Sequence, residues 1–268
     1  KLGQRPTHPE LLDWLAADFM EHGWSLKHLH RLILNSNAWQ QQVRNDPQQD
    51  MTDPDNLLYG GARLLRLDAE AIRDSILQVS GKLNDKPFGP AVPVMADEVG
   101  RFVIGKENLD AGRPGAVIDL KGEEFRRSVY VQIRRSRPLA VLDTFDRPQL
   151  TPNCEIRKPT TSATQSLMLM NSDLIISFSR MLAQEIAAKT TDADEQINSA
   201  WRSVYGRLPE ESERGEALHF VDSVRTEIPL PPSKEETSDE QKTKQQQERA
   251  VALLCQMLLS SNEFLYVD

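Results

Sequence analysis

The sequence predicts a mainly α-helical fold of helical hairpins or a bundle, with a small antiparallel β insertion at about residues 90–135. Apolar residues recur at helical spacing along most of the 268-residue chain, and helix-start and helix-stop residues flank these stretches. Between residues 84 and 126, Gly and Pro recur and short β-prone pieces appear. We expect one domain over residues 1–268, with a β-containing insertion at residues 84–135.

The first helical hairpin is predicted from its ends. Thr7 and Glu10 have the spacing of a capping box, and Gly23 suits the end of the first helix. Ser25 follows as the N-cap of a second helix, so the short connection predicts a helical hairpin. The first helix carries a stripe expected to face a core, formed by Leu12, Leu15, Ala16 and Phe19.

The next predicted elements alternate with proline-rich connections. A helix is expected at about residues 68–83, with Asp68 as its N-cap, and a short one within "RPLAVLDTFDRP". The best strand pattern, "RSVYVQIRR", covers residues 127–135. Further helices are predicted at 160–189 with a break near Asn171, at 193–206, at 210–227 and through the C-terminal "AVALLCQMLLSSNEFLYVD".

Residues 229–248 are polar, charged and Pro-containing, so we expect a mobile loop there. The net charge of −8 and the aromatic content of 6% argue against a nucleic-acid-binding surface. No apolar run approaches the roughly 20 residues that a membrane-spanning helix needs. We therefore expect neither nucleic acid nor a membrane span.

The chain contains two cysteines, Cys154 and Cys255, and no C-x-x-C pair. A zinc ribbon and a thioredoxin-like site are excluded within this segment. In an oxidising compartment the two cysteines could form a disulfide. The alternative is two separate buried thiols that behave as small apolar residues.

The stretch "LRLDAEAIRDSIL" contains a candidate acid cluster, Glu70, Arg73 and Asp74. Such a cluster could perform acid–base chemistry. It is also explained by a helix start at Asp68, because Glu70 suits the helix dipole and lies at ion-pairing spacing from Arg73. We favour the structural explanation.

The histidines predict no metal site. His28 and His30 lie two residues apart on one predicted helix and point in different directions. His8 and His22 lie near helix ends, where capping and the helix dipole explain them. The sequence also lacks common catalytic motifs, which leaves open whether it is an enzyme.

A basic cluster surrounds the predicted strand and is the best candidate for a ligand or partner surface. Arginine forks bind sulfate, phosphate or carboxylate groups through two parallel hydrogen bonds. The alternative is that these arginines pair with the chain's own acids, Asp143 and Asp146 among them. The candidate ligand-binding residues are Arg127, Arg134, Arg135 and Arg137, with Arg126 beside them.

Several segments together resemble a known family. They are "HPELLDWLAADFMEHGWSLKHLHRLILNSNAW", "RLDAEAIRD", "FRRSVYVQIRRSRPLAVLDTFDRP", "PNCEIRKPTTSATQSLMLMNS", "VYGRLPEESE" and "LLSSNEFLYVD". They resemble the planctomycete-specific domain of unknown function that ends large multi-domain proteins of that phylum. The resemblance implies a C-terminal fragment that follows a cytochrome-c-like haem domain, in an exported, periplasmic or cell-surface protein. Haem is not expected here, because the segment lacks Cys-x-x-Cys-His.

These observations favour a non-catalytic interaction or scaffold domain of an exported haem-containing protein. Its partners would be other domains or subunits of the same complex. One alternative is a module that binds or degrades acidic or sulfated glycans with the arginine cluster. Another is an electron-transfer accessory that docks a c-type cytochrome domain.

Overall fold

The computed structural model describes residues 5–43, 47–62, 64–106, 117–148, 157, 159–227 and 238–267. The chain divides into two compact units, whereas the sequence suggested one domain. One unit comprises Lys1–Leu65 with Tyr266–Asp268, and the other comprises Arg66–Leu265. We call them unit 1 and unit 2 and describe each by itself. The described helices include none that is both long and apolar enough to span a membrane.

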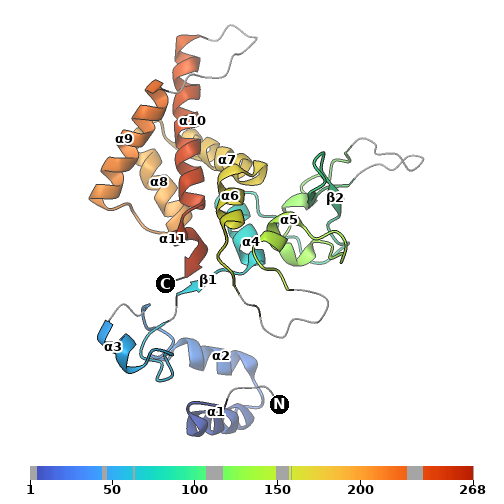
Figure 1. Ribbon diagram of the computed structural model, residues 1–268, viewed down its shortest axis with the longest axis vertical. Helices are drawn as coiled ribbons and strands as arrows, with labels where there is room; N and C mark the ends of the chain where they lie inside the picture. The colour runs from blue at the N-terminus through green and yellow to red at the C-terminus, as the bar shows by residue number, and fades with distance from the viewer. Residues whose placement is uncertain are drawn as a thin grey trace, which may run out of the picture. The chain divides into compact units, whose positions relative to one another are not determined.

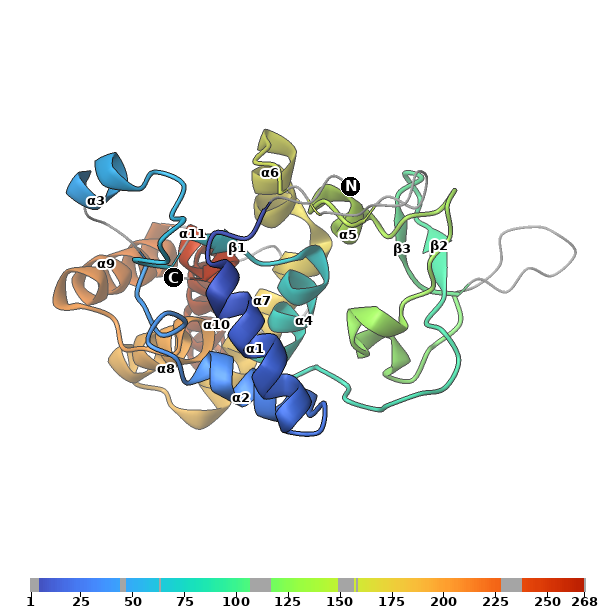
Figure 2. The same ribbon diagram turned by 90° about the horizontal axis from the view of Figure 1, so that it is seen from below.

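Unit 1 contains the helices α1 (Pro9–Glu21), α2 (Leu26–Leu34) and α3 (Pro47–Thr52). The predicted hairpin is confirmed, because α1 and α2 pack against each other (Figure 2). Ser25 caps α2 by accepting a hydrogen bond from the backbone N–H of His28 at 3.3 Å. The predicted capping box of α1 is wrong, since its N-cap is His8 and makes no side-chain capping bond.

The α1–α2 hairpin leaves its apolar side chains exposed. Neither helix contains a buried residue. In the expected core-facing stripe, Leu12 and Ala16 are exposed while Leu15 and Phe19 are only half-buried. Hydrophobic side chains that would normally be inside a domain therefore lie on the surface of this chain.

Unit 2 is built around a helical bundle of α7 (Asp173–Lys189), α8 (Ala193–Tyr205), α9 (Glu211–Glu227) and α10 (Asp239–Leu259). The long α10 packs against the other three (Figure 1). Side chains from all four helices form the core, among them Leu182, Ile186, Ile197, Val221, Val251 and Leu259. The mainly α-helical prediction is confirmed.

The boundary between α6 and α7 and the start of α10 can be compared with the boundaries predicted from the sequence. The predicted break near Asn171 is confirmed, because α6 (Ala163–Asn171) ends there and α7 starts after Ser172. Residues 239–248 belong to α10 and not to the expected loop. Ser238 and Gln241 form a capping box that starts this helix early, and the rest of it buries apolar residues against its neighbours. The remainder of the expected loop, 229–237, lies outside the described residues.

The small β insertion is present, but its strands differ from the predicted one. Strands β2 (Val94–Ala96) and β3 (Phe102–Ile104) pair antiparallel, with Met95 opposite Val103. The predicted strand at 127–135 is wrong. The chain there forms a 3₁₀ turn, η3 (Ser128–Tyr130), followed by a single bridge between Val131 and Val92. The cause is a tertiary contact, because Asp74 holds the backbone N–H of Ser128 at 2.7 Å.

Shorter elements connect the bundle to this insertion. α4 (Ala69–Val79) packs on α7, on η3 and on α5 (Ala140–Thr144). A second 3₁₀ turn, η2 (Glu123–Phe125), precedes η3. The last helix, α11 (Asn262–Leu265), packs on α8 and α10, and the strands β1 (Leu65–Arg66) and β4 (Tyr266–Val267) pair with each other. α4 thus faces both the bundle and the arginine-rich segment.

Candidate functional site

The candidate acid cluster on α4 is split between two environments, because Arg73 and Asp74 share contacts at Ser128 while Glu70 pairs elsewhere. Arg73 is 2% exposed and points into unit 2. Its Nη1 donates to the carbonyl oxygen of Arg126 at 2.9 Å, and its Nη2 to that of Glu124 at 2.8 Å. Burial lowers the pKa of Arg73 to about 10, although the nearby Asp74 carboxylate opposes this shift. Arg73 therefore fixes the η2–η3 backbone and does not pair with Glu70 as predicted.

Asp74 completes this buried arrangement. One of its oxygens accepts from both the backbone N–H and the hydroxyl of Ser128, each at 2.7 Å. Arg127 lies beside it, with Nε 3.5 Å from the other oxygen. All of these contacts hold the chain at 126–128 against α4. Asp74 thus acts as a structural acceptor, and Arg127 is partly neutralised.

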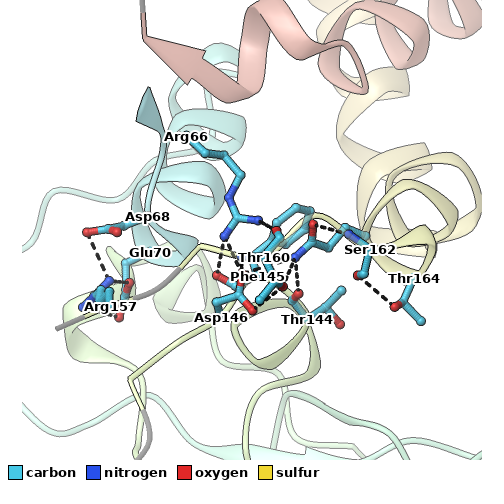
Figure 3. A network of polar contacts seen from close by, with 11 residues as sticks. Arg66, Asp68, Glu70, Thr144, Phe145, Asp146, Arg157, Thr160, Ser162 and Thr164 are labelled. Carbon is cyan, nitrogen blue, oxygen red and sulfur yellow. Dashed lines mark hydrogen bonds and ion pairs between the residues drawn. The ribbon is translucent and has the colours of Figure 1, made fainter. Parts of the chain in front are cut away.

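Glu70 and Asp68 face another arginine, which the sequence reading did not identify (Figure 3). Arg157 lies 2.6 Å from Glu70 and 3.2 Å from Asp68, measured between a guanidinium nitrogen and a carboxylate oxygen. The hydrogen bond to Glu70 raises the pKa of Arg157 above its ordinary value. Glu70 and Asp74 therefore hold separate partners, and these two carboxylates of the candidate cluster do not converge on one site as acid–base catalysis would require.

A second polar network fixes the segment before α6 (Figure 3). The Arg66 guanidinium lies 2.7 Å from the Asp146 carboxylate and also donates to the carbonyl oxygens of Phe145 and Thr160. Asp146 in turn accepts from the backbone N–H of Thr160 at 2.7 Å. Burial alone would raise the pKa of Asp146, but the bonds from Thr160 and Arg66 outweigh it and hold the pKa below its usual range.

Three arginines of the basic cluster, Arg134, Arg135 and Arg137, lack the carboxylate partners that the sequence suggested for them. Asp143 pairs with Arg147, and Asp146 pairs with Arg66, so the acids proposed as their partners are engaged elsewhere. Arg134, Arg135 and Arg137 are exposed. None of these three side chains forms an ion pair with another residue that the structure describes.

Arg134 and Arg137 line a pocket of about 500 Å³ beside the β2–β3 hairpin. We call it the basic pocket. Lys86 and Lys106 bring two further cations, which sequence reasoning missed because they lie far from the arginines in the chain. Arg135 does not line the pocket, and neither does Arg127. The described residues that line it are Lys86, Pro90, Ala91, Val92, Pro93, Val94, Met95, Gly105, Lys106, Leu120, Glu123, Gln132, Arg134 and Arg137.

Backbone pairing sets the walls of the basic pocket. Val92 donates to the carbonyl of Tyr130 and accepts from the N–H of Gln132, both at 2.8 Å, so the arginine segment runs beside the start of the hairpin. Gly105 closes the other side, where an added Cβ would lie 2.5 Å from the sulfur of Met95. Any larger residue at position 105 would require the Met95 side chain to move.

Arg126 supports the pocket from inside the protein. It is fully buried, its guanidinium lies 4.0 Å from the centre of the Tyr130 ring, and Nη1 donates to the carbonyl of Pro90 at 3.0 Å. Nη2 donates to the carbonyl of Phe88. Arg126 therefore anchors the 88–90 loop and is a structural residue in the middle of the basic cluster.

The charges around the pocket are unbalanced. Glu123 is its single lining carboxylate among the described residues. The hydrogen bond from Lys86, at 2.5 Å, lowers the pKa of Glu123 and keeps it ionised. Lys86 and Glu123 thus neutralise each other. Lys106, Arg134 and Arg137 remain as cations without an ion-pair partner in the described part of the chain, an arrangement suited to binding an anion.

The structure leaves the possible disulfide between Cys154 and Cys255 untested. Cys255 is a free thiol, buried in α10, and Cys154 lies outside the described residues. Burial raises the pKa of Cys255 to about 12. Such a thiol is unreactive at neutral pH and packs as a small apolar side chain.

Comparison with known protein families identifies the family of this chain and gives no activity. The chain belongs to the PSD1 family, described as a protein of unknown function (DUF1553), whose model matches residues 1–221. Neither a curated protein nor a solved structure matches it significantly. The match includes both α4 and the basic pocket, so the candidate site lies within the family domain.

Proposed function

We propose that this PSD1-family chain is a non-catalytic binding module that holds a sulfate or carboxylate group of an acidic glycan in the basic pocket. The observation that carries the proposal is the gathering of Lys106, Arg134 and Arg137 around one pocket in a chain of net charge −8. Against that background, a local excess of cations attracts acidic groups selectively.

The composition of the pocket fits such a ligand. Two guanidinium groups provide paired N–H donors that match the spacing of sulfate or carboxylate oxygens, and the lysine adds a point charge. The remaining lining is apolar or small, including Val92, Pro93 and Met95. Apolar surface of this kind packs against the C–H face of a sugar ring, and a pocket of about 500 Å³ lies within the size range of small-ligand sites.

The pocket's chemistry favours binding over hydrolysis. Glycoside hydrolysis requires two carboxyl groups on opposite sides of the scissile bond. Among the described residues, Glu123 is the pocket's single carboxylate, and it already contacts both Lys86 and Arg126. A bound sugar would meet cations and no acid–base pair.

Titration calorimetry with defined acidic oligosaccharides tests the proposal. We would compare a sulfated hexasaccharide and an oligogalacturonate on the wild-type chain, on Arg134→Gln/Arg137→Gln, and on Arg135→Gln as the matched control. The double variant should bind at least about tenfold more weakly, because each charge-assisted contact contributes on the order of 1.5–3 kcal/mol. Arg135→Gln should bind as the wild type does.

Two results would count against this function. Equal affinity of the double variant and the wild type would place binding elsewhere. If neither oligosaccharide binds the wild-type chain at low ionic strength, an acidic glycan is excluded as the ligand. Raising the salt concentration should weaken a genuine interaction, because exposed charges are screened.

A second candidate function rests on the exposed apolar surface of unit 1. Trp14, Trp24 and Trp39 are 53%, 66% and 62% exposed, and tryptophan is enriched at the centres of protein interfaces. This observation favours docking to another domain or subunit of a larger exported protein, with a c-type cytochrome domain as the first partner to test. Sedimentation of the chain with that haem domain at micromolar concentrations should show a complex that Trp14→Ser/Trp24→Ser weakens; no complex would remove this candidate.

A further inference from the structure

The α1–α2 hairpin brings together three metal-ligating side chains that the sequence reading kept apart. Asp18 lies in the last turn of α1, His22 is the C-cap residue of that helix, and His28 comes from the first turn of α2. One ligand atom from each, two imidazole nitrogens and a carboxylate oxygen, lie within 4.8 Å of one another. The sequence interpretation considered only His28 with His30, which point in different directions, and did not identify this group. The three residues come together because the turn after Glu21 reverses the chain.

Asp18 stands between the two imidazoles. Its Oδ2 lies 2.9 Å from Nε2 of His28, and its Oδ1 lies 3.2 Å from Nδ1 of His22. The same His22 nitrogen is 2.9 Å from the backbone carbonyl of Asp18. The two rings are stacked, with centroids 3.9 Å apart and planes 13° from parallel. Each imidazole therefore presents one nitrogen toward a single shared carboxylate.

We propose that Asp18, His22 and His28 bind a divalent first-row transition metal ion, for which Zn²⁺ is the natural probe. Two imidazoles and a carboxylate are ligands that zinc accepts, with metal–ligand distances of about 2.0–2.2 Å. Ligand atoms around such an ion lie roughly 3–3.5 Å apart in tetrahedral geometry. The observed atoms need only small side-chain rotations to reach that spacing.

The solvent exposure of the three side chains is compatible with these rotations. The side chain of Asp18 is 15% exposed, whereas those of His22 and His28 are 48% and 34% exposed. The carboxylate is therefore held near its position, and both rings retain room to turn. Ser25 caps α2 and fixes the backbone of His28, so the ligands on the two helices are positioned before metal binds. Positioning of this kind reduces the entropy that binding must overcome.

Metal binding replaces hydrogen bonds with coordination bonds. In the metal-free hairpin an imidazole nitrogen of each histidine contacts Asp18. A bound ion takes the lone pair of that nitrogen, and the N–H proton of the neutral imidazole ligand lies on the other ring nitrogen. Three protein ligands leave one position of a tetrahedral ion open, and the exposure of both histidines directs it toward solvent. That position is available to water or to a small anion.

The test measures metal binding by the whole chain. Calorimetry with Zn²⁺, together with the metal content after desalting, should give one ion per chain. Asp18→Asn, His22→Gln and His28→Gln should each weaken binding at least about tenfold. His30→Gln is the matched control, since it lies on the same helix outside the trio, and it should bind as the wild type does. Co²⁺ should give visible ligand-field bands in the wild type that disappear in the three variants.

The proposal is overturned if His22→Gln and His28→Gln bind zinc as tightly as the wild type does. It is also overturned if the wild type binds no zinc when Zn²⁺ is in about 100-fold molar excess over the protein. Circular dichroism of each variant separates lost binding from lost folding. The outcome is independent of the anion proposal, because the basic pocket belongs to unit 2. Arg134→Gln/Arg137→Gln should bind zinc normally, and His28→Gln should bind acidic oligosaccharide normally.

Discussion

Two groups of arginines in unit 2 have opposite surroundings. Arg73 and Arg126 are 2% and 0% exposed, and their guanidinium groups donate to backbone carbonyls and lie near carboxylates. Arg134 and Arg137 follow eight and eleven residues after Arg126 in the same segment, yet they are exposed and contact no acid among the described residues. Closeness in the sequence therefore does not determine what an arginine in this segment does.

The difference follows from the cost of burying charge. A buried guanidinium stabilises a fold only when its donors are satisfied, and removing one partner of such an arrangement is strongly destabilising. An exposed arginine without a partner contributes little to stability and keeps its donors for another molecule. We therefore expect stability to depend on the buried group and ligand binding to depend on the exposed one.

The largest effect should come from Arg73→Met. The change keeps most of the volume but leaves the carbonyls of Glu124 and Arg126 without their donor inside the protein. We expect a loss of about 3 kcal/mol in the free energy of unfolding, measured by urea denaturation. Arg135→Met is the exposed control and should change it by less than about 0.5 kcal/mol. Equal losses of unfolding free energy in Arg73→Met and Arg135→Met would contradict the expected difference between buried and exposed arginines.

Asp146→Asn should have the next largest effect, about 2 kcal/mol at pH 7, because it removes the carboxylate paired with Arg66. The pKa of Asp146 is lowered in the folded protein, so its contribution is full above the ordinary pKa near 3.9. The contribution disappears as the pH falls through the lowered value. Urea unfolding from pH 7 to pH 3 should show the variant and the wild type converging, and parallel curves would contradict this assignment.

A smaller, pH-dependent effect is expected at Glu213. Arg207 holds this carboxylate with two bonds of 2.7 Å, and the pairing lowers the pKa of Glu213 to about 2. Its stabilisation is therefore present above pH 4.5 and is lost between pH 4.5 and pH 2. Both side chains are about a third exposed, so we expect Glu213→Gln to cost only about 1 kcal/mol at pH 7. A cost that persists unchanged at pH 2 would rule out this charge effect.

Much of the helical framework could be predicted from the sequence, because periodicity and capping are local signals. The break between α6 and α7 and the positions of α8 and α9 are examples. The turn at Ser128 could not be predicted this way. Its alternating pattern suits a strand, but a carboxylate 54 residues away holds the backbone in a turn.

The candidate site was also predictable only in part, because residues that are far apart in the sequence form it. Arg134 and Arg137 were identified from their local density of charge. Lys86 and Lys106 were missed because only the β2–β3 fold brings them to the same pocket. Arg73 was expected to pair with Glu70 on the helix surface, whereas its partners are backbone carbonyls more than 50 residues away. Patterns within one helix cannot indicate such contacts.

The most direct test of the account measures unfolding free energy with and without a sulfated hexasaccharide, for the wild type and for Arg134→Gln/Arg137→Gln. Without ligand, the two proteins should agree within about 0.5 kcal/mol, because these arginines are exposed. At a ligand concentration of 100 Kd the wild type should gain about 2.7 kcal/mol, and the variant should gain far less. A variant that is destabilised without ligand, or stabilised by ligand as much as the wild type, would contradict the account.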